Sequence, residues 1–295
     1  MSYYNAAEEQ MLRKLSLRRD STGDDDFDEN VVEYFKTVKP PLLNSKTFPF
    51  ANLETLKRDK ERVAAKRERI YQTEKTPQAV MAEYIVKAMF EGKNFSFIDR
   101  KNSIVSVSTS EFDELFLGKD VLLWFQGVKG KNSGRELYLG IDVTTSDNSD
   151  VIIKKKDHVE ENLLERGLGR LKYFYNKRDK ETPSGNVTVP EIIIVFEYSD
   201  ISTLRNLMVY LFKNNPLYDE LKPDIKHQVD KFAANFLDKF IGELIFNLNK
   251  IRREIDYPSK PISLTKKNDL ESGYAYTNDL YLHLLELRAR LDESS

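Results

Sequence analysis

Two apolar runs near the middle of the chain, joined by a connection that contains glycines, most constrain its fold. Residues 121–128 are apolar enough to be buried on both faces of a sheet, and residues 137–143 are a second such run. The glycines and Asn132 of the connection favour a hairpin. Asp120 precedes the first run, and Asp142 lies near the end of the second. Burying an unpaired carboxylate is costly, so such an acid caps a turn, pairs with a base or holds a metal.

The composition limits the chemistry that is available. The chain has no cysteine and three histidines, so disulfides and thiolate metal sites are excluded and a histidine-rich zinc site is not expected. Carboxylates and lysines must therefore carry any chemistry. The formal net charge of -2 gives no overall attraction to nucleic acid, so a basic surface for it would be local. No long apolar run and no signal-peptide pattern is present, which predicts a cytoplasmic protein without a membrane segment.

Changes in composition predict four regions. Residues 1–50 are expected to be a charged, largely disordered arm, because six acids lie among residues 20–29 and prolines follow them. Residues 51–76 are rich in Lys, Arg, Glu and Ala, which predicts an exposed charged helix. Residues 77–200 contain the apolar strands and form the expected core. Residues 201–295 are predicted to be helical.

Within the core the predicted order is one helix, three strands, a second helix and a last strand. Thr76 and Pro77 suit the start of the first helix, and Asp157 with Glu160 forms a capping box for the second. The run DVIIKKK before the second helix is compatible with one more strand. The main elements are expected at residues 77–91, 95–108, 120–128, 136–144, 158–176 and 190–198. The predicted fold class is α/β, with a mixed sheet flanked by helices and a helical region after it.

Three acids fall at particular places in this order. Asp120 in GKDVLLW begins the second strand, Asp142 in IDVT lies on the third, and Glu83 in MAEYIV lies on the first helix. The chain thereby resembles the PD-(D/E)XK nuclease-like (restriction-endonuclease-like) superfamily, which has acids at these places and a (D/E)-x-K motif on its third strand. The resemblance implies that the three carboxylates hold a metal ion. Here Thr144 replaces the motif lysine and makes the pattern D-x-T, so the positive charge is missing.

Another lysine has to replace the missing one if the site is active. A hairpin after Asp142 would return one of three consecutive lysines, residues 154–156, to its neighbourhood, and Lys172 on the following helix is an alternative. Lys154 and Lys156 join the two aspartates in the predicted catalytic set.

The chemistry that the resemblance implies is hydrolysis of a DNA or RNA phosphodiester with magnesium or manganese. Mg²⁺ prefers oxygen ligands and is held by one or two carboxylates. A metal polarises a phosphoryl oxygen and lowers the pKa of a bound water, while a nearby lysine orients that water or neutralises developing charge. Between residues 154 and 180 nine bases outnumber five acids, which is a modest electrostatic match for a phosphate backbone.

Other interpretations of the same residues remain open. Asp120 and Asp142 are also typical turn acids, Glu83 suits the exposed face of a helix, and the lysines suit a solvated sheet edge. The chain would then be a catalytically inactive module that keeps the fold and binds nucleic acid or protein. A third hypothesis is self-association through an apolar face of the C-terminal helices, although such a face more often packs inside one chain. That face comprises Phe232, Phe236, Phe240, Ile241 and Leu244.

Overall fold

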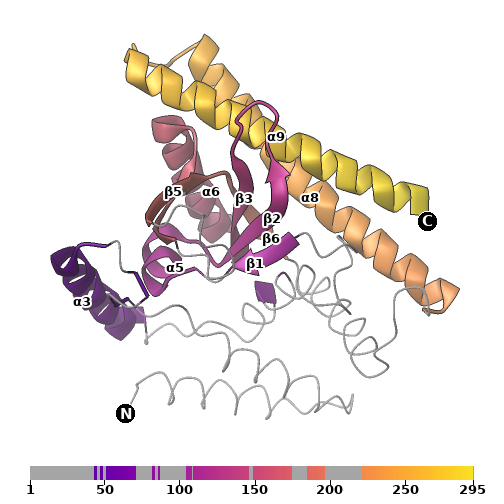
Figure 1. Ribbon diagram of the computed structural model, residues 1–295, viewed down its shortest axis with the longest axis horizontal. Helices are drawn as coiled ribbons and strands as arrows, with labels where there is room; N and C mark the ends of the chain where they lie inside the picture. The colour runs from indigo at the N-terminus through magenta and orange to yellow at the C-terminus, as the bar shows by residue number, and fades with distance from the viewer. Residues whose placement is uncertain are drawn as a thin grey trace.

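A mixed sheet of four strands, in the spatial order β1-β2-β3-β6, lies at the centre of the molecule (Figure 1). The computed structural model describes residues 43–44, 47–48, 51–70, 82–83, 86, 104–107, 109–145, 149–174, 185–196 and 221–294. The strands are β1 (Ile104–Val107), β2 (Val121–Lys129), β3 (Glu136–Thr144), β4 (Gly169–Phe174), β5 (Gly185–Val189) and β6 (Glu191–Val195). The helices are α3 (Leu53–Ile70), α5 (Glu111–Leu117), α6 (Ser149–Arg166), α8 (Pro223–Asp256) and α9 (Leu264–Ser294).

The connections of the central sheet confirm the predicted α/β class. β1, β2 and β3 are antiparallel neighbours, whereas β6 is parallel to β3. A parallel pair needs a crossover, and α6 is part of the connection here. β4 and β5 form a small antiparallel sheet of their own.

The central strands are buried on both faces, as their apolar runs predict. On β2, Val121, Leu123 and Phe125 belong to the cluster that contains the long helices. Leu122 and Trp124 belong to a second cluster, which includes residues of β4 and β5. The small sheet therefore covers one face and the pair α8–α9 covers the other.

The helices α8 and α9 lie side by side along the sheet (Figure 1). The apolar face predicted on residues 232–244 is internal: Phe236, Phe240, Ile241 and Leu244 are buried with the sheet residues, and Phe232 packs against them. These residues therefore form part of the core of a single chain, and self-association of the C-terminal helices would have to use other residues. Among the helices of the described ranges, none is long and apolar enough to span a membrane.

A tyrosine of α9 bonds the backbone of β3 where β6 does not pair with it. The pairing of β3 with β6 begins at Gly140. Just before it, the Tyr276 hydroxyl accepts a hydrogen bond from the Tyr138 backbone N at 2.8 Å and donates to the Glu136 carbonyl at 2.7 Å. Since unpaired backbone groups are costly when buried, Tyr276 takes the place of a strand partner.

The structure corrects the predicted boundaries after β3. The run DVIIKKK lies in α6, which begins at Ser149, and is not a strand. The helix predicted to reach residue 176 ends at Arg166, and β4 follows it. Gly167 has φ +71°, and a Cβ there would lie 2.6 Å from the Asp269 carbonyl. Gly167 thus ends α6 where only glycine allows α9 to pass closely.

Other boundaries also differ from the prediction. The run SKPISLTKKNDLESG suggests an exposed link, but α9 begins inside it, at Leu264. The short helix α5 and strand β5 are additional elements. The first predicted helix is described only at residues 82–83 and 86, where Ala82 and Val86 are buried in the main cluster. The rest of that helix lies outside the described residues.

The predicted exposed helix is anchored on one side. Leu56 and Val63 of α3 are buried together with Phe112 of α5. Leu43 and Phe48, from the segment expected to be a disordered arm, belong to the same cluster, so this part of the arm is packed. The other residues of the arm lie outside the described ranges.

Candidate functional site

Two acids and one lysine meet at the end of β3. Asp142 is on the face of β3 opposite α8 and α9, because its neighbours Ile141 and Val143 pack with those helices. Its side chain is buried, and Lys155 of α6 donates from Nζ to Asp142 Oδ1 at 2.5 Å. The Lys155 side chain is 33 % exposed, so it is partly open to solvent.

Asp120 is the second acid of this group. Its backbone N donates to the Ile141 carbonyl at 3.0 Å, and its Oδ2 accepts from the Val143 backbone N at 2.9 Å. These bonds fix the Asp120 carboxyl at the junction of β2 and β3, close enough to Asp142 for its charge to act on that carboxyl. The structure thus brings together the two aspartates that the sequence places on neighbouring strands.

A glycine makes room for this pair. Gly118 ends α5 with φ +65°, and a Cβ at this position would lie 3.3 Å from Asp142 Oδ2. Glycine is suited to the left-handed conformation and leaves space beside the carboxyl. The turn that ends α5 therefore also shapes the acid site.

The surroundings of the Asp142 carboxyl oppose its negative charge. Burial, and then the nearby charge of Asp120, raises the pKa of Asp142 to about 7, although the Lys155 ammonium acts in the opposite direction. A bound cation would relieve the repulsion between the carboxylates of Asp120 and Asp142.

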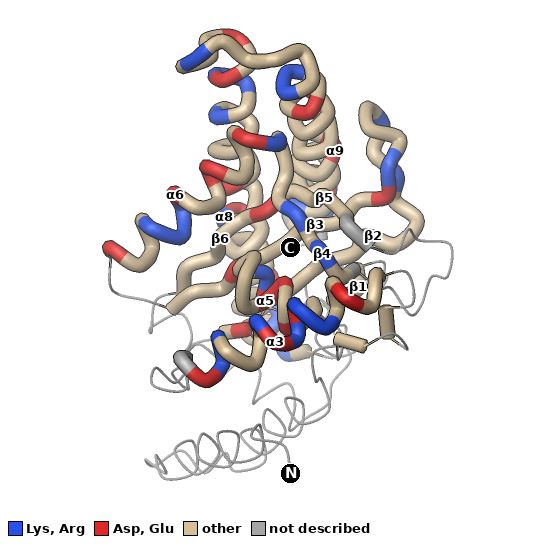
Figure 2. The backbone as a smooth tube through the Cα atoms, turned by 90° about the vertical axis from the view of Figure 1, so that its left-hand side faces the viewer, with Lys and Arg blue, Asp and Glu red and all other residues tan. Residues whose placement is uncertain are grey.

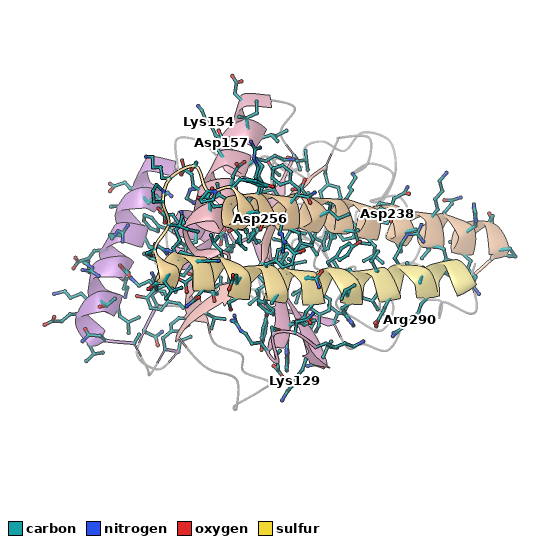
Figure 3. All side chains as sticks on the ribbon, turned by 90° about the horizontal axis from the view of Figure 1, so that it is seen from above. Lys129, Lys154, Asp157, Asp238, Asp256 and Arg290 are labelled. Carbon is teal, nitrogen blue, oxygen red and sulfur yellow. The ribbon has the colours of Figure 1, made fainter. Side chains whose placement is uncertain are left out.

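The three consecutive lysines have different surroundings. Lys155 faces Asp142, Lys156 donates to Glu243 Oε1 of α8 at 3.1 Å, and Lys154 is exposed at the periphery of α6 (Figure 3). The structure therefore places Lys155 at Asp142, and neither Lys154 nor Lys156 of the predicted catalytic set. Consecutive residues of a helix point about 100° apart, so one lysine of the three faces the acid pair.

Lys172 does not reach the acid pair either. It forms an ion pair with Asp59 of α3, and the Tyr173 hydroxyl donates to the same carboxylate at 2.7 Å. Burial acts to raise the pKa of Asp59, but the bonds from Lys172 and Tyr173 outweigh it and hold that pKa below its ordinary value. Lys172 thus anchors α3 to β4.

Glu83 does not complete a metal site of three carboxylates with Asp120 and Asp142. Across the described ranges, no three side chains of the Asp, Glu, His or Cys type form a group that could hold a metal ion. Glu83 is buried, on the helical residues 82–83. The expected set of three ligands is therefore reduced to the two aspartates.

A buried ion pair next to the acids was not predicted. The Lys119 ammonium contacts Glu191 of β6 and donates to the Leu117 carbonyl at 2.8 Å, and both charged side chains are almost fully buried. Glu191 is aligned with Gly140 in the parallel pairing of β3 and β6. The sequence shows Glu191 as an acid at the first position of an apolar strand. It does not show that Lys119 is its partner, because that depends on the order of the strands in the sheet.

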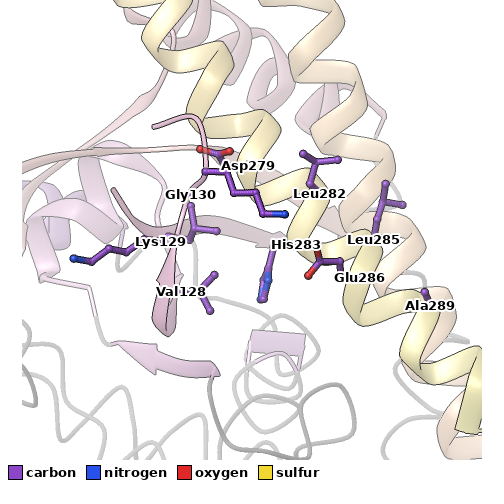
Figure 4. Close-up of a pocket in the computed structure, with 11 residues that line it drawn as sticks. Val128, Lys129, Gly130, Asp279, Leu282, His283, Leu285, Glu286 and Ala289 are labelled. Carbon is purple, nitrogen blue, oxygen red and sulfur yellow. The ribbon is translucent and has the colours of Figure 1, made fainter. Parts of the chain in front are cut away.

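A hollow of about 420 Å³ lies between the β2–β3 hairpin and α9 (Figure 4). Asp279 of α9 accepts from the backbone N of Ser133 at 2.7 Å and from Asn132 Nδ2 at 2.7 Å. Because this carboxylate is engaged by the hairpin turn, the hollow is a structural joint between the hairpin and α9. It is separate from the pair Asp120 and Asp142.

Comparisons with known proteins leave the site to be interpreted from its own geometry. No family model matches this chain, and neither a curated protein nor a solved structure does.

Proposed function

We propose that this chain is a metal-dependent nuclease that hydrolyses phosphodiesters of DNA or RNA. The observation that carries the proposal is the contact of Lys155 with Asp142, beside Asp120. It supplies a positive charge where the sequence has Thr144 in the place of the motif lysine. The resemblance to the PD-(D/E)XK superfamily supports the proposal through the strand order β1-β2-β3-β6 with β3 and β6 parallel.

The two aspartates fit a magnesium or manganese ion. They are adjacent carboxyl groups, and the charge of Asp120 contributes to the raised pKa of Asp142. Mg²⁺ is held by one or two carboxylates together with substrate phosphates and water, so a pair is sufficient. When bound, such an ion supplies stabilisation for the charge that develops on the phosphoryl group.

Lys155 has a separate role in this proposal. An ammonium group has three N–H donors, and one of them is directed to Asp142 Oδ1. The others are available to a phosphoryl oxygen or to the attacking water, because the side chain is partly exposed. Lys155 would therefore orient the reactants and offset negative charge, while Asp142 holds the ammonium in place.

Basic residues around the site suit a nucleic-acid substrate. Lysines and arginines lie on α6, β4 and α3, and α6 and α3 also carry acids (Figure 2). The charge is local, as the overall net charge of -2 requires. We include a cytoplasmic location in the proposal on the basis of the sequence.

Activity and metal binding together test this function. The parent protein should cleave single-stranded or double-stranded DNA or RNA with Mg²⁺ or Mn²⁺, and Asp142→Asn should reduce cleavage by at least about 100-fold. Mn²⁺ should raise the melting temperature of the parent protein and have a smaller effect on Asp142→Asn. Asp157→Asn changes an exposed carboxyl of α6 and serves as the control.

The possible results separate the hypotheses. Cleavage that persists in Asp142→Asn would show that the activity belongs to another site or to a contaminant. Nucleic-acid binding without cleavage, and without an effect of Mn²⁺ on the parent melting temperature, would favour the inactive binding module.

A further inference from the structure

A second pocket, of about 230 Å³, lies beside the acid site between α5, the end of α6 and β4. Its lining consists of Phe112, Leu117, Lys119, Asn162, Arg166, Arg170 and Lys172. Four of these seven residues are basic, and none is acidic. The pocket is therefore suited to an anion.

The four cations of the pocket differ in how far they are already paired. Lys119 forms an ion pair with Glu191, and Lys172 forms one with Asp59. These two lysines are therefore structural parts of the pocket wall. Within the described ranges, the ion pair of Arg166 is with the exposed carboxylate of Glu165, at 3.6 Å. Arg170 is exposed and has no ion pair within the described part of the chain. The two arginines are therefore available to a ligand.

Two available guanidinium groups favour phosphate as the ligand. Guanidinium binds phosphate oxygens with two parallel hydrogen bonds. A terminal phosphate monoester carries a charge of about -1.5 to -2 at neutral pH, whereas an internal phosphodiester carries one charge. A volume of about 230 Å³ equals roughly eight water molecules at about 30 Å³ each, which is room for a phosphate and part of its sugar.

The pocket and the acid pair share one border. Lys119 lines the pocket, and the next residue in the chain is Asp120. Asn162 and Arg166 come from α6, the helix that also presents Lys155 to Asp142. A strand end held in the pocket would therefore approach the two aspartates from the side of Lys119.

We propose that this pocket binds the terminal phosphate monoester of a nucleic-acid strand, so that the chain acts near strand ends. The inference rests on the proposed nuclease function for its substrate, but its binding step requires no cleavage. Arg166 and Arg170 supply the recognition, and Phe112 and Leu117 form the apolar part of the wall.

Binding of short oligonucleotides in EDTA tests the pocket without cleavage. Oligonucleotides with a 5′-phosphate, with a 3′-phosphate and with hydroxyl ends should be compared by fluorescence anisotropy. One of the phosphorylated forms should bind about 10-fold more tightly than the hydroxyl form. Arg166→Gln with Arg170→Gln should remove this preference, whereas the two lysine substitutions, Arg166→Lys with Arg170→Lys, should retain part of it.

A matched control removes two positive charges elsewhere. Lys231→Gln with Arg290→Gln changes two exposed residues, one near the start of α8 and one near the end of α9, away from the pocket. Arg290 is 17 positions beyond Gly273, which contacts the end of α6, so it lies about 25 Å further along the helix. This control should weaken the binding of all three oligonucleotides equally, so the preference for a phosphorylated end should remain.

The results distinguish failure of the pocket from failure of the nuclease proposal. A phosphate preference that Arg166→Gln with Arg170→Gln removes, in a protein that never cleaves, would support the pocket and count against the nuclease. Metal-dependent cleavage without any such preference would overturn the pocket alone. Competition by inorganic phosphate, with equal binding of the three oligonucleotides, would assign the pocket to free phosphate and overturn its role with strand ends.

Discussion

Lys155 reaches Asp142 from a helix, 13 positions later in the chain, and places its ammonium 2.5 Å from the Asp142 carboxylate. The lysine and the acid therefore belong to different elements. In the (D/E)-x-K pattern both would lie on one strand, where residues two apart share a face. Here the strand has Thr144 at that position, and α6 provides the charge.

We expect the three consecutive lysines to differ sharply in their effect on cleavage. Lys155→Gln should lower kcat by about 100-fold, because it removes the positive charge beside Asp142. Lys154→Gln should stay within a few-fold of the parent protein, since this side chain is exposed. Single-turnover cleavage assays of both variants make the comparison at equal net charge. Equal losses of cleavage rate in the two variants would show that Lys155 has no special role in catalysis.

The stability of Asp142→Asn should depend on pH in a defined direction. The pKa of Asp142 is raised to about 7 in the folded protein from an ordinary value near 3.9. Stability is therefore lost as the carboxyl ionises between about pH 4 and pH 7. Asparagine avoids this loss, so Asp142→Asn should gain in melting temperature relative to the parent as pH rises from about 5 to 8. The measurement requires EDTA, and an unchanged difference would contradict the raised pKa.

Asp59→Asn should show the opposite dependence. The pKa of Asp59 is lowered overall, since the bonds from Lys172 and Tyr173 outweigh its burial. Its carboxylate stabilises the fold above the unfolded pKa near 3.9, and this stability is lost as pH falls through the lower folded pKa. The variant should therefore be less stable than the parent at neutral pH, and the difference should shrink below about pH 4 in thermal melts.

Breaking the pair of Lys119 and Glu191 should destabilise the fold strongly. Glu191→Leu leaves a buried ammonium without its carboxylate and should cost about 3 kcal/mol. Lys119→Met combined with Glu191→Leu removes both charges and should recover much of that loss. Urea unfolding of the two variants measures the difference. A double variant less stable than Glu191→Leu would contradict this interpretation.

Tyr276→Phe should weaken the attachment of α9 to the sheet. It removes the hydroxyl that bonds the Tyr138 backbone N and the Glu136 carbonyl, and should cost about 1–3 kcal/mol. Hydrogen exchange at the amide of Tyr138 should become faster than at Leu139, which pairs with β2. Equal protection of the two amides would show that the hydroxyl is dispensable.

The sequence predicted the elements whose pattern depends on burial alone. β3 has the predicted bounds, and β2 differs by one residue at each end, because both strands are apolar on both faces. The adjacency of Asp120 and Asp142 followed from this register. The start of α6 was missed because a short run such as DVIIKKK fits a strand or a helix, and this choice decides which lysine faces the acids.

Other features could not be read from local patterns. The pairing of Lys119 with Glu191 requires β6 to lie beside β3, and strand order is a property of the whole chain. The early end of α6 depends on Gly167, where α9 crosses the chain from about 100 residues further along. Local propensity carries no information about such a crossing.

The crossing at Gly167 also links distant parts of the molecule. A Cβ at Gly273 would lie 2.4 Å from the Gly167 carbonyl, so alanine there would have to displace α6 or α9. α9 carries Tyr276 one turn later and Asp279 two turns later, and these residues hold β3 and the hairpin. We therefore expect Gly273→Ala, which adds one carbon atom to α9, to disturb the strand that carries Asp142.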